Sequence, residues 1–376
     1  MKFLADKAIP YVEELFSHLG EVKLLPASAI SRDHLLDTDG LITRTTTKIN
    51  SELLEGTRVK FVGTATIGTD HIDIPYLQKN GIKFSSAPGC NATAVGEFVL
   101  NAILRYTHEN NISLDNQVIG IIGAGNTGTA LRNKAEKIGL SCLLCDPLLE
   151  KTDNNSAYLP LYELIRQSTI LSFHVPLTKK GKYPTIKLVN DAFFKGINPE
   201  AILINTSRGE VIDEKSLLKN RNRFQGLILD VWNNEPNISS RVLAVTDIAT
   251  PHVAGYSVEG KIRGTEMIYH AACKLLQIQT HWKPDLISEI VTQKYIHLDR
   301  SDDFLSSALK QVYDIKQDDQ TVRNIFNPEH AGSGFAELRN QYPFRNEFSA
   351  FLIKSNYPLN KHKKQILSEL GFKIDK

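Results

Sequence analysis

One short segment limits what this chain can fold into more than any other. The apolar run VIGII at 118–122 predicts a buried strand, and the run GAGNTG (123–128) follows it and opens a predicted helix. Here Gly123 permits the tight turn, Gly125 lets the backbone approach a pyrophosphate, and Gly128 allows the helix to pack closely on the strand. The segment therefore predicts a βαβ unit that binds phosphates at the N-terminus of the helix.

A carboxylate in the expected place strengthens this prediction. The next apolar strand, CLLC (142–145), is followed by Asp146, 18 residues after Gly128, at the position that accepts the adenosine ribose hydroxyls in dinucleotide-binding folds. A carboxylate there would repel a 2′-phosphate, so NAD is favoured over NADP as the cofactor. The alternative is a glycine turn in an unrelated α/β unit, with an acid downstream by chance.

Strands alternate with helices along most of the chain, which favours parallel sheets in layered α/β domains. Six apolar runs between 118 and 250 describe a doubly wound sheet, a helix is expected at 258–278, and polar amphipathic segments follow from about 285. We expect an α/β fold with three domains. They are a Rossmann NAD-binding domain (94–256) inserted in a discontinuous flavodoxin-like substrate (lid) domain (1–93 and 257–284), and a small C-terminal α+β domain (285–376).

Composition agrees with a soluble multidomain protein. The 376 residues suit two to three domains, and the net charge of +2 argues against a nucleic-acid partner. Asp6 and Lys7 interrupt the apolar N-terminus before a signal peptide could form, and no apolar run is long enough to span a membrane. Four cysteines are too few for a disulfide framework, so we expect a cytoplasmic protein. Cys142 and Cys145 have no second pair to complete a zinc site, so they are interpreted as core residues and no metal is expected.

Three side chains with complementary chemistry follow three successive predicted strands, at the edge where open α/β sheets bind ligands. They are Arg208 after AILINT (201–206), Glu235 after GLILDV (226–231) and His252 after DIAT (247–250). An arginine can grip a carboxylate, a histidine can exchange a proton near neutral pH, and a glutamate can orient that histidine. This set suits hydride transfer at a 2-hydroxyacid: His252 would take the hydroxyl proton, Glu235 would hold the imidazole, and Arg208 would fix the carboxylate. Taken singly, each residue has an ordinary structural interpretation.

At this point the sequence resembles the D-isomer-specific 2-hydroxyacid dehydrogenases. A C-terminal tail that contains ELRNQYPFRNEF distinguishes it from the phosphoglycerate and formate dehydrogenases of that family, and a small phosphorylated 2-hydroxyacid is the expected substrate. The resemblance rests on GTATIGTDHID (63–73), GCNATAVGEF (89–98), the glycine loop, HVPLT (174–178), NTSRGEVID (205–213), LDVWNNEP (229–236) and HVAGYSVEG (252–260).

The resemblance implies further site residues. Arg208, Glu235 and His252 fall on the catalytic positions of the family, and the tail corresponds to a dimerisation domain that would make a homodimer. Substrate positions fall on Thr45, Thr66 and Tyr256. Cofactor positions fall on Asn126, Thr127, Asp146, Val175, Thr206, Arg208, Asp230 and Gly255.

Two cationic positions are candidates for the substrate phosphate. Arg44 stands with three threonines at a predicted strand end, which suits a phosphate, although a solvated turn is the alternative. Arg345, in the tail, is a second hypothesis that rests on the resemblance and on its charge.

The chain departs from the family pattern in three places. Thr45 replaces an expected serine and keeps the hydroxyl. Lys187 replaces an expected histidine, and Val175 replaces a threonine. A cofactor contact at position 175 would survive if it runs through the backbone.

Two other functions stay open at this stage. One is oxidation of another D-2-hydroxyacid, such as 3-phosphoglycerate, which also has a carboxylate, a 2-hydroxyl and a terminal phosphate. The other is an NAD-sensing interaction protein built on the same fold, which the near-neutral charge and the lack of disordered tails make less favoured.

Overall fold

The computed structural model describes residues 1–153, 158–279, 285–300, 303–325 and 331–375. The chain divides into two compact units. The first contains Met1–Asn91 and Ser257–Thr292, and the second contains Ala92–Tyr256 and Gln293–Lys376.

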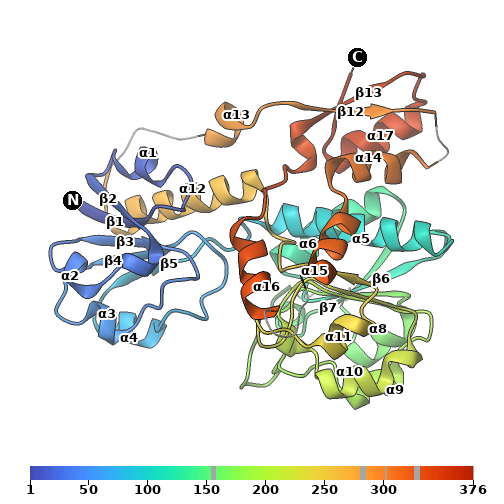
Figure 1. Ribbon diagram of the computed structural model, residues 1–376, viewed down its shortest axis with the longest axis horizontal. Helices are drawn as coiled ribbons and strands as arrows, with labels where there is room; N and C mark the ends of the chain where they lie inside the picture. Colours follow the sequence, from blue (N-terminus) through green and yellow to red (C-terminus); the bar gives the residue numbers. More distant parts are fainter. Residues whose placement is uncertain (154–157, 280–284, 301–302, 326–330, 376) are drawn as a thin grey trace. The chain divides into compact units, whose positions relative to one another are not determined.

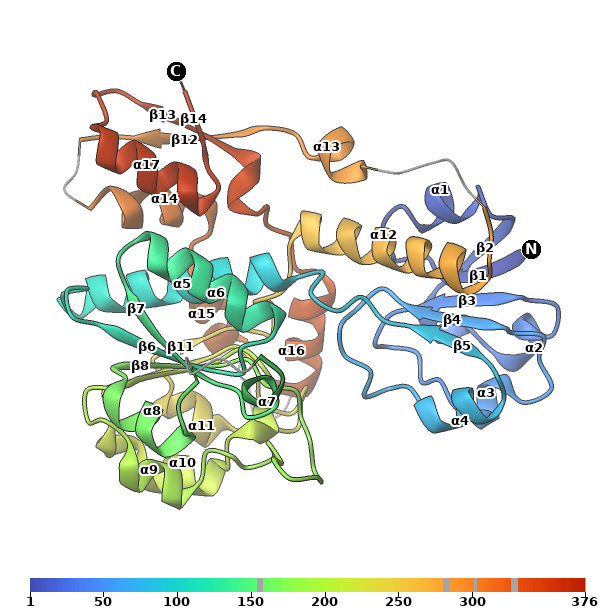
Figure 2. The same cartoon turned by 180° about the vertical axis from the view of Figure 1, so that it is seen from behind.

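The first unit is built on a five-stranded parallel sheet in the order β2-β1-β3-β4-β5. This is the flavodoxin-like strand order, as expected. Figure 2 shows α1 and α12 on one face of the sheet and α2, α3 and α4 on the other. Its elements are β1 (Lys2–Asp6), α1 (Val12–Phe16), β2 (Glu21–Leu25), η1 (Ala27–Ala29), α2 (Arg32–Leu35), β3 (Gly40–Thr43), α3 (Ser51–Leu54), β4 (Phe61–Thr64), α4 (Ile74–Lys79), β5 (Lys83–Ser85), α12 (Val258–Leu275) and α13 (Leu286–Ile290).

Helix α12 returns to this unit from far along the sequence because its apolar face completes the core. Tyr269 is fully buried and meets the edge of the Phe16 ring, and Phe16 in turn meets Phe3 on β1. A Cβ on Gly63 of β4 would lie 2.4 Å from the Ile268 side chain, so only glycine allows this closeness of strand and helix. The first unit is therefore discontinuous in sequence.

The second unit contains the predicted doubly wound sheet, with six parallel strands in the order β11-β10-β9-β8-β6-β7. Figure 1 shows α5 and α6 on one face and α8, α9, α10 and α11 on the other. The elements are α5 (Ala92–Glu109), β6 (Val118–Ile122), α6 (Asn126–Lys137), β7 (Ser141–Cys145), α7 (Leu149–Asp153), α8 (Leu161–Gln167), β8 (Ile170–Phe173), α9 (Asp191–Gly196), β9 (Ile202–Asn205), η2 (Gly209–Val211), α10 (Glu214–Asn220), η3 (Arg221–Arg223), β10 (Gly226–Leu229), α11 (Ser240–Val245) and β11 (Ile248–Ala249).

Strand order reverses at β6, which pairs with β7 on one side and β8 on the other. Such a reversal is where open α/β sheets bind their ligands, at the carboxyl ends of the strands. The sheet has the six strands that the sequence predicts, and beyond β7 the described residues add a bridge between Leu144 and Tyr158. The glycine loop follows β6 and so lies at the reversal point.

The C-terminal residues of the second unit form a small three-stranded sheet in the order β12-β13-β14. The predicted mixture of helices and strands is confirmed, including the final helix and short strand. All three strands are parallel, because helices connect them, whereas an α+β domain commonly has antiparallel strands. The elements are β12 (Lys294–Leu298), α14 (Phe304–Val312), α15 (Ile315–Asn324), α16 (Ala331–Asn340), η4 (Phe348–Ala350), β13 (Phe351–Ser355), α17 (Lys361–Leu370) and β14 (Lys373–Ile374).

These C-terminal elements contact the helices of the larger sheet directly (Figure 2). The Asn101 amide on α5 donates to the carbonyl oxygens of Leu309 and Tyr313, and Lys134 on α6 donates to that of Leu370. Both contacts join side chains of the helices on the larger sheet to the backbone of the C-terminal residues. The tail is thereby fixed to the face of α5 and α6.

Cys145 is buried, as its interpretation as a core residue requires, and Cys142 is partly buried and packs against an apolar cluster. All four are free, and Cys90, Cys145 and Cys273 are buried. Burial raises the pKa of Cys142 to about 12 and that of Cys145 to about 11, so both thiols stay protonated. Among the described residues, no helix has the length and apolarity needed to cross a bilayer.

Candidate functional site

The glycine loop has the geometry that its sequence predicts. Gly123 adopts a φ of 94°, a left-handed conformation that favours glycine, and its N–H donates to the carbonyl of Cys145 on β7. A Cβ on Gly123 would lie 2.8 Å from the carbonyl of His174, at the end of β8. A Cβ on Gly128 would lie 2.1 Å from the Gly123 oxygen, so α6 can pack this closely on β6 only without a side chain there.

Gly125 differs from the other two glycines because a Cβ there would enter open space. It is the N-cap of α6, and Asn126 and Thr127 are the first residues of the helix. The N-terminus of a helix attracts anions through its dipole and its backbone N–H groups. The structure therefore leaves room at Gly125 for a pyrophosphate.

Asp146 and Thr206 also fit a bound dinucleotide. The Asp146 carboxylate accepts a hydrogen bond of 3.1 Å from the backbone N–H of Ala124, which ties the end of β7 to the glycine loop. The Thr206 hydroxyl, after β9, is buried and has no hydrogen-bond partner in the protein. A buried hydroxyl without a partner costs free energy, and a contact with a cofactor would satisfy it.

The end of β8 contributes a residue that sequence reasoning used only as part of a motif. His174 lies beside the glycine loop, and its Nε2 is 2.9 Å from the Ser172 hydroxyl. Burial lowers the pKa of His174 to about 4, so the imidazole is neutral at physiological pH. The Val175 side chain would lie 3.0 Å from a Cβ on Gly123, so it packs against the loop.

Glu235 and His252 come together as expected. Oε2 of Glu235 lies 2.7 Å from Nδ1 of His252, and Oε1 accepts the backbone N–H of Trp232 at 2.9 Å. Burial alone would raise the pKa of Glu235. The hydrogen bond and charge of His252 outweigh that effect, helped by the Trp232 N–H and by Arg339, and hold the pKa below its usual value. The carboxylate therefore stays ionised against the imidazole.

The backbone around His252 is held by Asp230, which is almost fully buried. Its carboxylate accepts hydrogen bonds from the Thr250 hydroxyl at 2.6 Å, from the N–H of Val253 at 2.8 Å and from the N–H of Ala254 at 3.0 Å. Asp230 thus has a structural role in addition to the cofactor position that the family resemblance implies. Gly255 follows in the same loop and is partly exposed.

Arg208 follows β9, the strand next to β10. Its Nη1 donates to the Ser207 carbonyl at 2.8 Å, and its own carbonyl accepts the Asn205 amide at 2.9 Å. The three predicted catalytic residues thus follow β9, β10 and β11, which are neighbours in the sheet. Of the three, Glu235 and His252 are joined by a hydrogen bond.

Arg345 does not have the role that its charge suggested. Its guanidinium donates to the carbonyls of Val253 at 2.8 Å, Ala94 at 3.1 Å and Ala254, and it lies over the Tyr313 ring at 4.9 Å. These contacts occupy the guanidinium with the backbone that follows His252. The contacts therefore do not support the hypothesis that Arg345 binds the substrate phosphate. They give Arg345 a structural role instead, which is to hold the loop that follows His252.

Tyr256 lies at the end of the same loop. Its ring contacts those of Tyr342 and Phe344 from the C-terminal residues, with centroids 5.8 and 5.9 Å apart. The departure at Lys187 has a plain structural role, because the exposed Lys187 ammonium lies 3.2 Å from the Asp213 carboxylate.

In the first unit, the predicted substrate residues follow neighbouring strands. Thr45 is exposed after β3, and the Thr66 hydroxyl after β4 lies 2.8 Å from that of Thr64. Arg44 forms an ion pair with the buried Asp6, at 2.7 Å. Burial, and then the charge of Arg44, lower the pKa of Lys261 to about 8.

Sequence reasoning missed Lys261, although it directly follows the HVAGYSVEG motif, because it lies over 200 residues from Arg44 and only the packing of α12 brings the two cations together. Two cations that lie close together and are partly shielded from water, as Arg44 and Lys261 are, can bind an anion.

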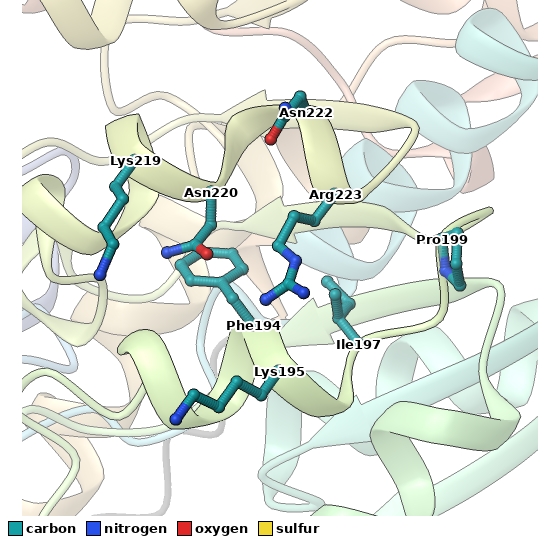
Figure 3. Close-up of a pocket in the computed structure, with 8 residues that line it drawn as sticks. All are labelled: Phe194, Lys195, Ile197, Pro199, Lys219, Asn220, Asn222 and Arg223. Atoms are coloured by element: carbon teal, nitrogen blue, oxygen red, sulfur yellow. The ribbon is translucent and has the colours of Figure 1, made fainter.

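A separate pocket of about 610 Å³ lies in the second unit, against α9, α10 and η3 (Figure 3). Phe194, Lys195, Lys219 and Arg223 are among its lining residues. These elements lead into the amino-terminal ends of β9 and β10, the edge opposite the glycine loop. Lys195 and Lys219 stand in the last turns of helices, where cations are stabilised by the helix dipole. None of the predicted site residues lines this pocket.

Two family models match parts of this chain. Residues 97–254 match the family described as "D-isomer specific 2-hydroxyacid dehydrogenase, NAD binding domain", and residues 288–371 match "Domain of unknown function (DUF3410)". A protein of Proteus mirabilis named erythronate-4-phosphate dehydrogenase is 39% identical over 380 residues, covering 99% of each chain. A protein of the same name from Yersinia pestis is 39% identical over 381 residues, with the same coverage.

Solved structures share the fold over about three quarters of this chain. An NAD⁺-bound 3-phosphoglycerate dehydrogenase of Entamoeba histolytica has a TM-score of 0.62 at 24% identity, covering 74% of this chain and 96% of that one. A D-lactate dehydrogenase of Aquifex aeolicus, complexed with NAD and lactic acid, has a TM-score of 0.58 at 24% identity, with the same coverage. At this identity the likeness concerns the fold alone.

Proposed function

This chain belongs to the D-isomer specific 2-hydroxyacid dehydrogenases, and from that premise we propose that it oxidises erythronate 4-phosphate at C2 to the 2-oxo acid. Its cofactor is NAD. The reaction is a step in the synthesis of pyridoxal 5′-phosphate. The observation that carries the proposal is the 2.7 Å contact between Glu235 and His252, in the same unit as the glycine loop and in a chain similar over 99% of its length to relatives of that name.

In this proposal His252 is the general base. Its Nδ1 is held by Glu235, so Nε2 is the atom that takes the proton from the substrate hydroxyl. The ionised Glu235 stabilises the imidazolium that results. Arg208 binds the substrate carboxylate and the oxygen that becomes the carbonyl, since a guanidinium can donate to both. NAD, when bound, would supply the acceptor for the hydride that leaves C2.

The cofactor would be held by residues of the second unit. Gly123, Gly125 and Gly128 shape the loop for the pyrophosphate, with Asn126 and Thr127 at the start of α6, and Asp146 binds the ribose hydroxyls. Thr206 offers its unpartnered hydroxyl. Val175, Asp230 and Gly255 are the remaining proposed contacts, with position 175 acting through its backbone.

For the substrate we propose Thr45, Thr66 and Tyr256, with Arg44 and Lys261 supplying positive charge for the phosphate. A phosphate close to Lys261 would favour the protonated ammonium, which burial and Arg44 disfavour. The overall charge of +2 gives little attraction to a doubly anionic substrate, so placed cations must provide it.

We also propose the wider setting of the enzyme. Residues 94–256 would be the NAD-binding domain, 1–93 with 257–284 the substrate domain, and 285–376 a separate domain through which two copies form a homodimer. The enzyme would act in the cytoplasm, on a small molecule, without nucleic-acid or membrane partners.

The test compares two substrates with the purified protein. NADH formation is measured with erythronate 4-phosphate and with 3-phosphoglycerate over the same concentration range. We expect kcat/KM to be at least about a hundredfold higher for erythronate 4-phosphate, because the two acids differ in length and in hydroxyl groups that the site must bind. A preference for 3-phosphoglycerate would replace the proposed substrate, and no turnover of either would favour the NAD-sensing alternative.

A further inference from the structure

We propose that Arg339, in the C-terminal residues that match a domain of unknown function, is a positioning residue for the Glu235–His252 pair. The inference rests on the proposed function, because it assigns a role in the same reaction. It gives residues 288–371 a part in catalysis in addition to the proposed dimerisation.

The first observation is a shared oxygen. Nη1 of Arg339 lies 3.4 Å from Oε2 of Glu235, the same oxygen that lies 2.7 Å from Nδ1 of His252. The other oxygen, Oε1, accepts the Trp232 N–H. Three donors thus surround the carboxylate, and Arg339 is separated from it by 104 residues in sequence. Removing Arg339 would leave Oε2 with His252 alone among these donors.

The second observation is that the helix carrying Arg339 is anchored in the core of the second unit. Phe335 of α16 is 1% exposed and belongs to the same apolar cluster as Trp232, and Leu338 packs against that cluster. After the helix, the Tyr342 hydroxyl donates to Asp318 at 2.7 Å. Arg339 is therefore presented to Glu235 by a fixed segment.

The third observation is an unsatisfied hydrogen-bond donor in the Arg339 side chain. Nε of Arg339 is buried and has no hydrogen-bond partner. An unpartnered N–H in this position is unfavourable, and an arginine with only a surface role would turn that group to solvent. The guanidinium is held here despite that cost, which fits a role at Glu235.

In the described part of the chain, His252 and Arg339 carry the positive charges that lower the pKa of the Glu235 carboxyl. When His252 accepts a proton, its imidazolium and the guanidinium compete for Oε2. Arg339 thus helps to orient the ionised Glu235, and its positive charge repels an imidazolium at His252. Oxidation of the hydroxyl requires neutral His252, so loss of Arg339 should move the acid limb of the kcat/KM profile to higher pH.

The test uses the full-length enzyme and three variants. Arg339→Met removes the charge, and we expect kcat to fall about tenfold and the acid limb to rise by about one pH unit. Arg339→Lys keeps the charge and should return the acid limb of the kcat/KM profile to its wild-type position. If the methionine variant folds poorly, the lysine variant still tests the inference. Arg323→Met is the matched control. Arg323 also lies in the C-terminal residues, binds Asp319 and the Thr246 carbonyl, and should lower thermal stability without moving the profile.

A double-mutant cycle with Glu235→Gln shows whether Arg339 acts through Glu235. We expect the loss of kcat from Arg339→Met to be smaller than threefold when Glu235→Gln is already present, since the carboxylate is then gone. An unchanged pH profile in Arg339→Met, or full additivity of the two substitutions, would overturn the inference. So would a rise in KM alone, which would make Arg339 a direct substrate contact. If the wild-type enzyme itself produced no NADH, the proposed function would fail, and this is a separate result from failure of the variants.

Discussion

Glu235 Oε2 lies 2.7 Å from His252 Nδ1, although His252 adopts a φ of 60°, in the left-handed region that residues other than glycine seldom occupy. Such a conformation costs about 1–3 kcal/mol and persists where surrounding contacts impose it. Asp230 imposes it here through its bonds to the N–H groups of Val253 and Ala254. Arg345 holds the carbonyls of the same two residues from the other side. The side chain of His252, the proposed proton acceptor, is thus positioned by a strained backbone whose N–H groups and carbonyls are both held by other side chains.

The first prediction concerns Asp230. In Asp230→Asn one carboxylate oxygen becomes an NH₂ group, which leaves one of the three donors facing another donor. We expect the free energy of unfolding to fall by about 1–3 kcal/mol and kcat to fall at least about tenfold. The reason is that the loop at 250–254 relaxes and no longer holds the His252 side chain in position. Urea unfolding and steady-state kinetics measure both. Thr250→Val, which removes only the hydroxyl donor, should have the smaller effect on kcat; an equal loss in the two variants would contradict this account.

The second prediction uses two glycines of one loop. Gly125→Ala adds a methyl group in open space, so the fold should remain as stable as the wild type while the Kd for NAD rises about tenfold. Gly128→Ala would place its methyl group 2.1 Å from the Gly123 oxygen, so the protein should lose about 2 kcal/mol of stability or more. Thermal unfolding and NAD titration compare the two. A loss of stability in Gly125→Ala would contradict this account, because it would show that the space around the added methyl group is already occupied.

The third prediction concerns the choice between the two nicotinamide cofactors. Asp146→Asn removes the charge and keeps an oxygen that can accept from Ala124, although its NH₂ group then faces the N–H groups of Leu148 and Leu149, which donate to Oδ1 of Asp146. We expect the ratio of kcat/KM for NADP to that for NAD to rise at least about tenfold, since the repulsion of the 2′-phosphate is lost. Initial rates with both cofactors measure it. A ratio that stays at the wild-type value would mean that Asp146 does not face the ribose.

A fourth prediction concerns stability and pH. Burial raises the pKa of Glu97 to about 7, although Lys134 lies 2.9 Å away and partly opposes the shift. In the unfolded chain the pKa of this carboxyl is about 4.3. Between this pKa and the higher pKa of the folded state, the folded protein therefore binds more protons than the unfolded chain. The free energy of unfolding should therefore fall as pH rises from about 4.3 to 7, by up to about 3 kcal/mol.

The measurement is urea unfolding at several pH values across this range, with Glu97→Gln as the comparison. The glutamine can still accept the N–H of Phe348, which donates to Glu97 at 3.0 Å. It cannot titrate, so its stability should depend less on pH in this window. Identical slopes in the two proteins would rule out Glu97 as the source.

Much of this fold was predictable because local sequence determines it. The strand at 118–122 begins and ends at the predicted residues, and α6 begins at Asn126, within the GAGNTG run that was predicted to open a helix. The buried parallel strands are continuous apolar runs, and such runs can be read without knowledge of their neighbours. The hydrogen bond between Glu235 and His252 followed from their positions after neighbouring strands, since parallel strands end at one edge of the sheet.

Contacts between distant segments were not predictable in the same way. Arg339 lies in the ELRNQYPFRNEF segment, but that segment gives no sign of a contact with Glu235, because the contact depends on how α16 packs in three dimensions. The charge of Arg345 suggested a phosphate, but its actual partners are backbone carbonyls, which carry no signal in the sequence. Lys261 is a further example, because it becomes a candidate only once α12 has packed against the sheet that carries Arg44.

The central claim is that this chain oxidises a phosphorylated 2-hydroxyacid through His252, and one measurement tests it most directly. NADH formation from erythronate 4-phosphate is followed for the wild type and for His252→Ala, with NAD binding measured for both proteins. The account predicts turnover by the wild type and a fall in kcat of about a hundredfold or more in His252→Ala, with the Kd for NAD unchanged. Equal kcat in the two proteins, at equal NAD binding, would contradict it.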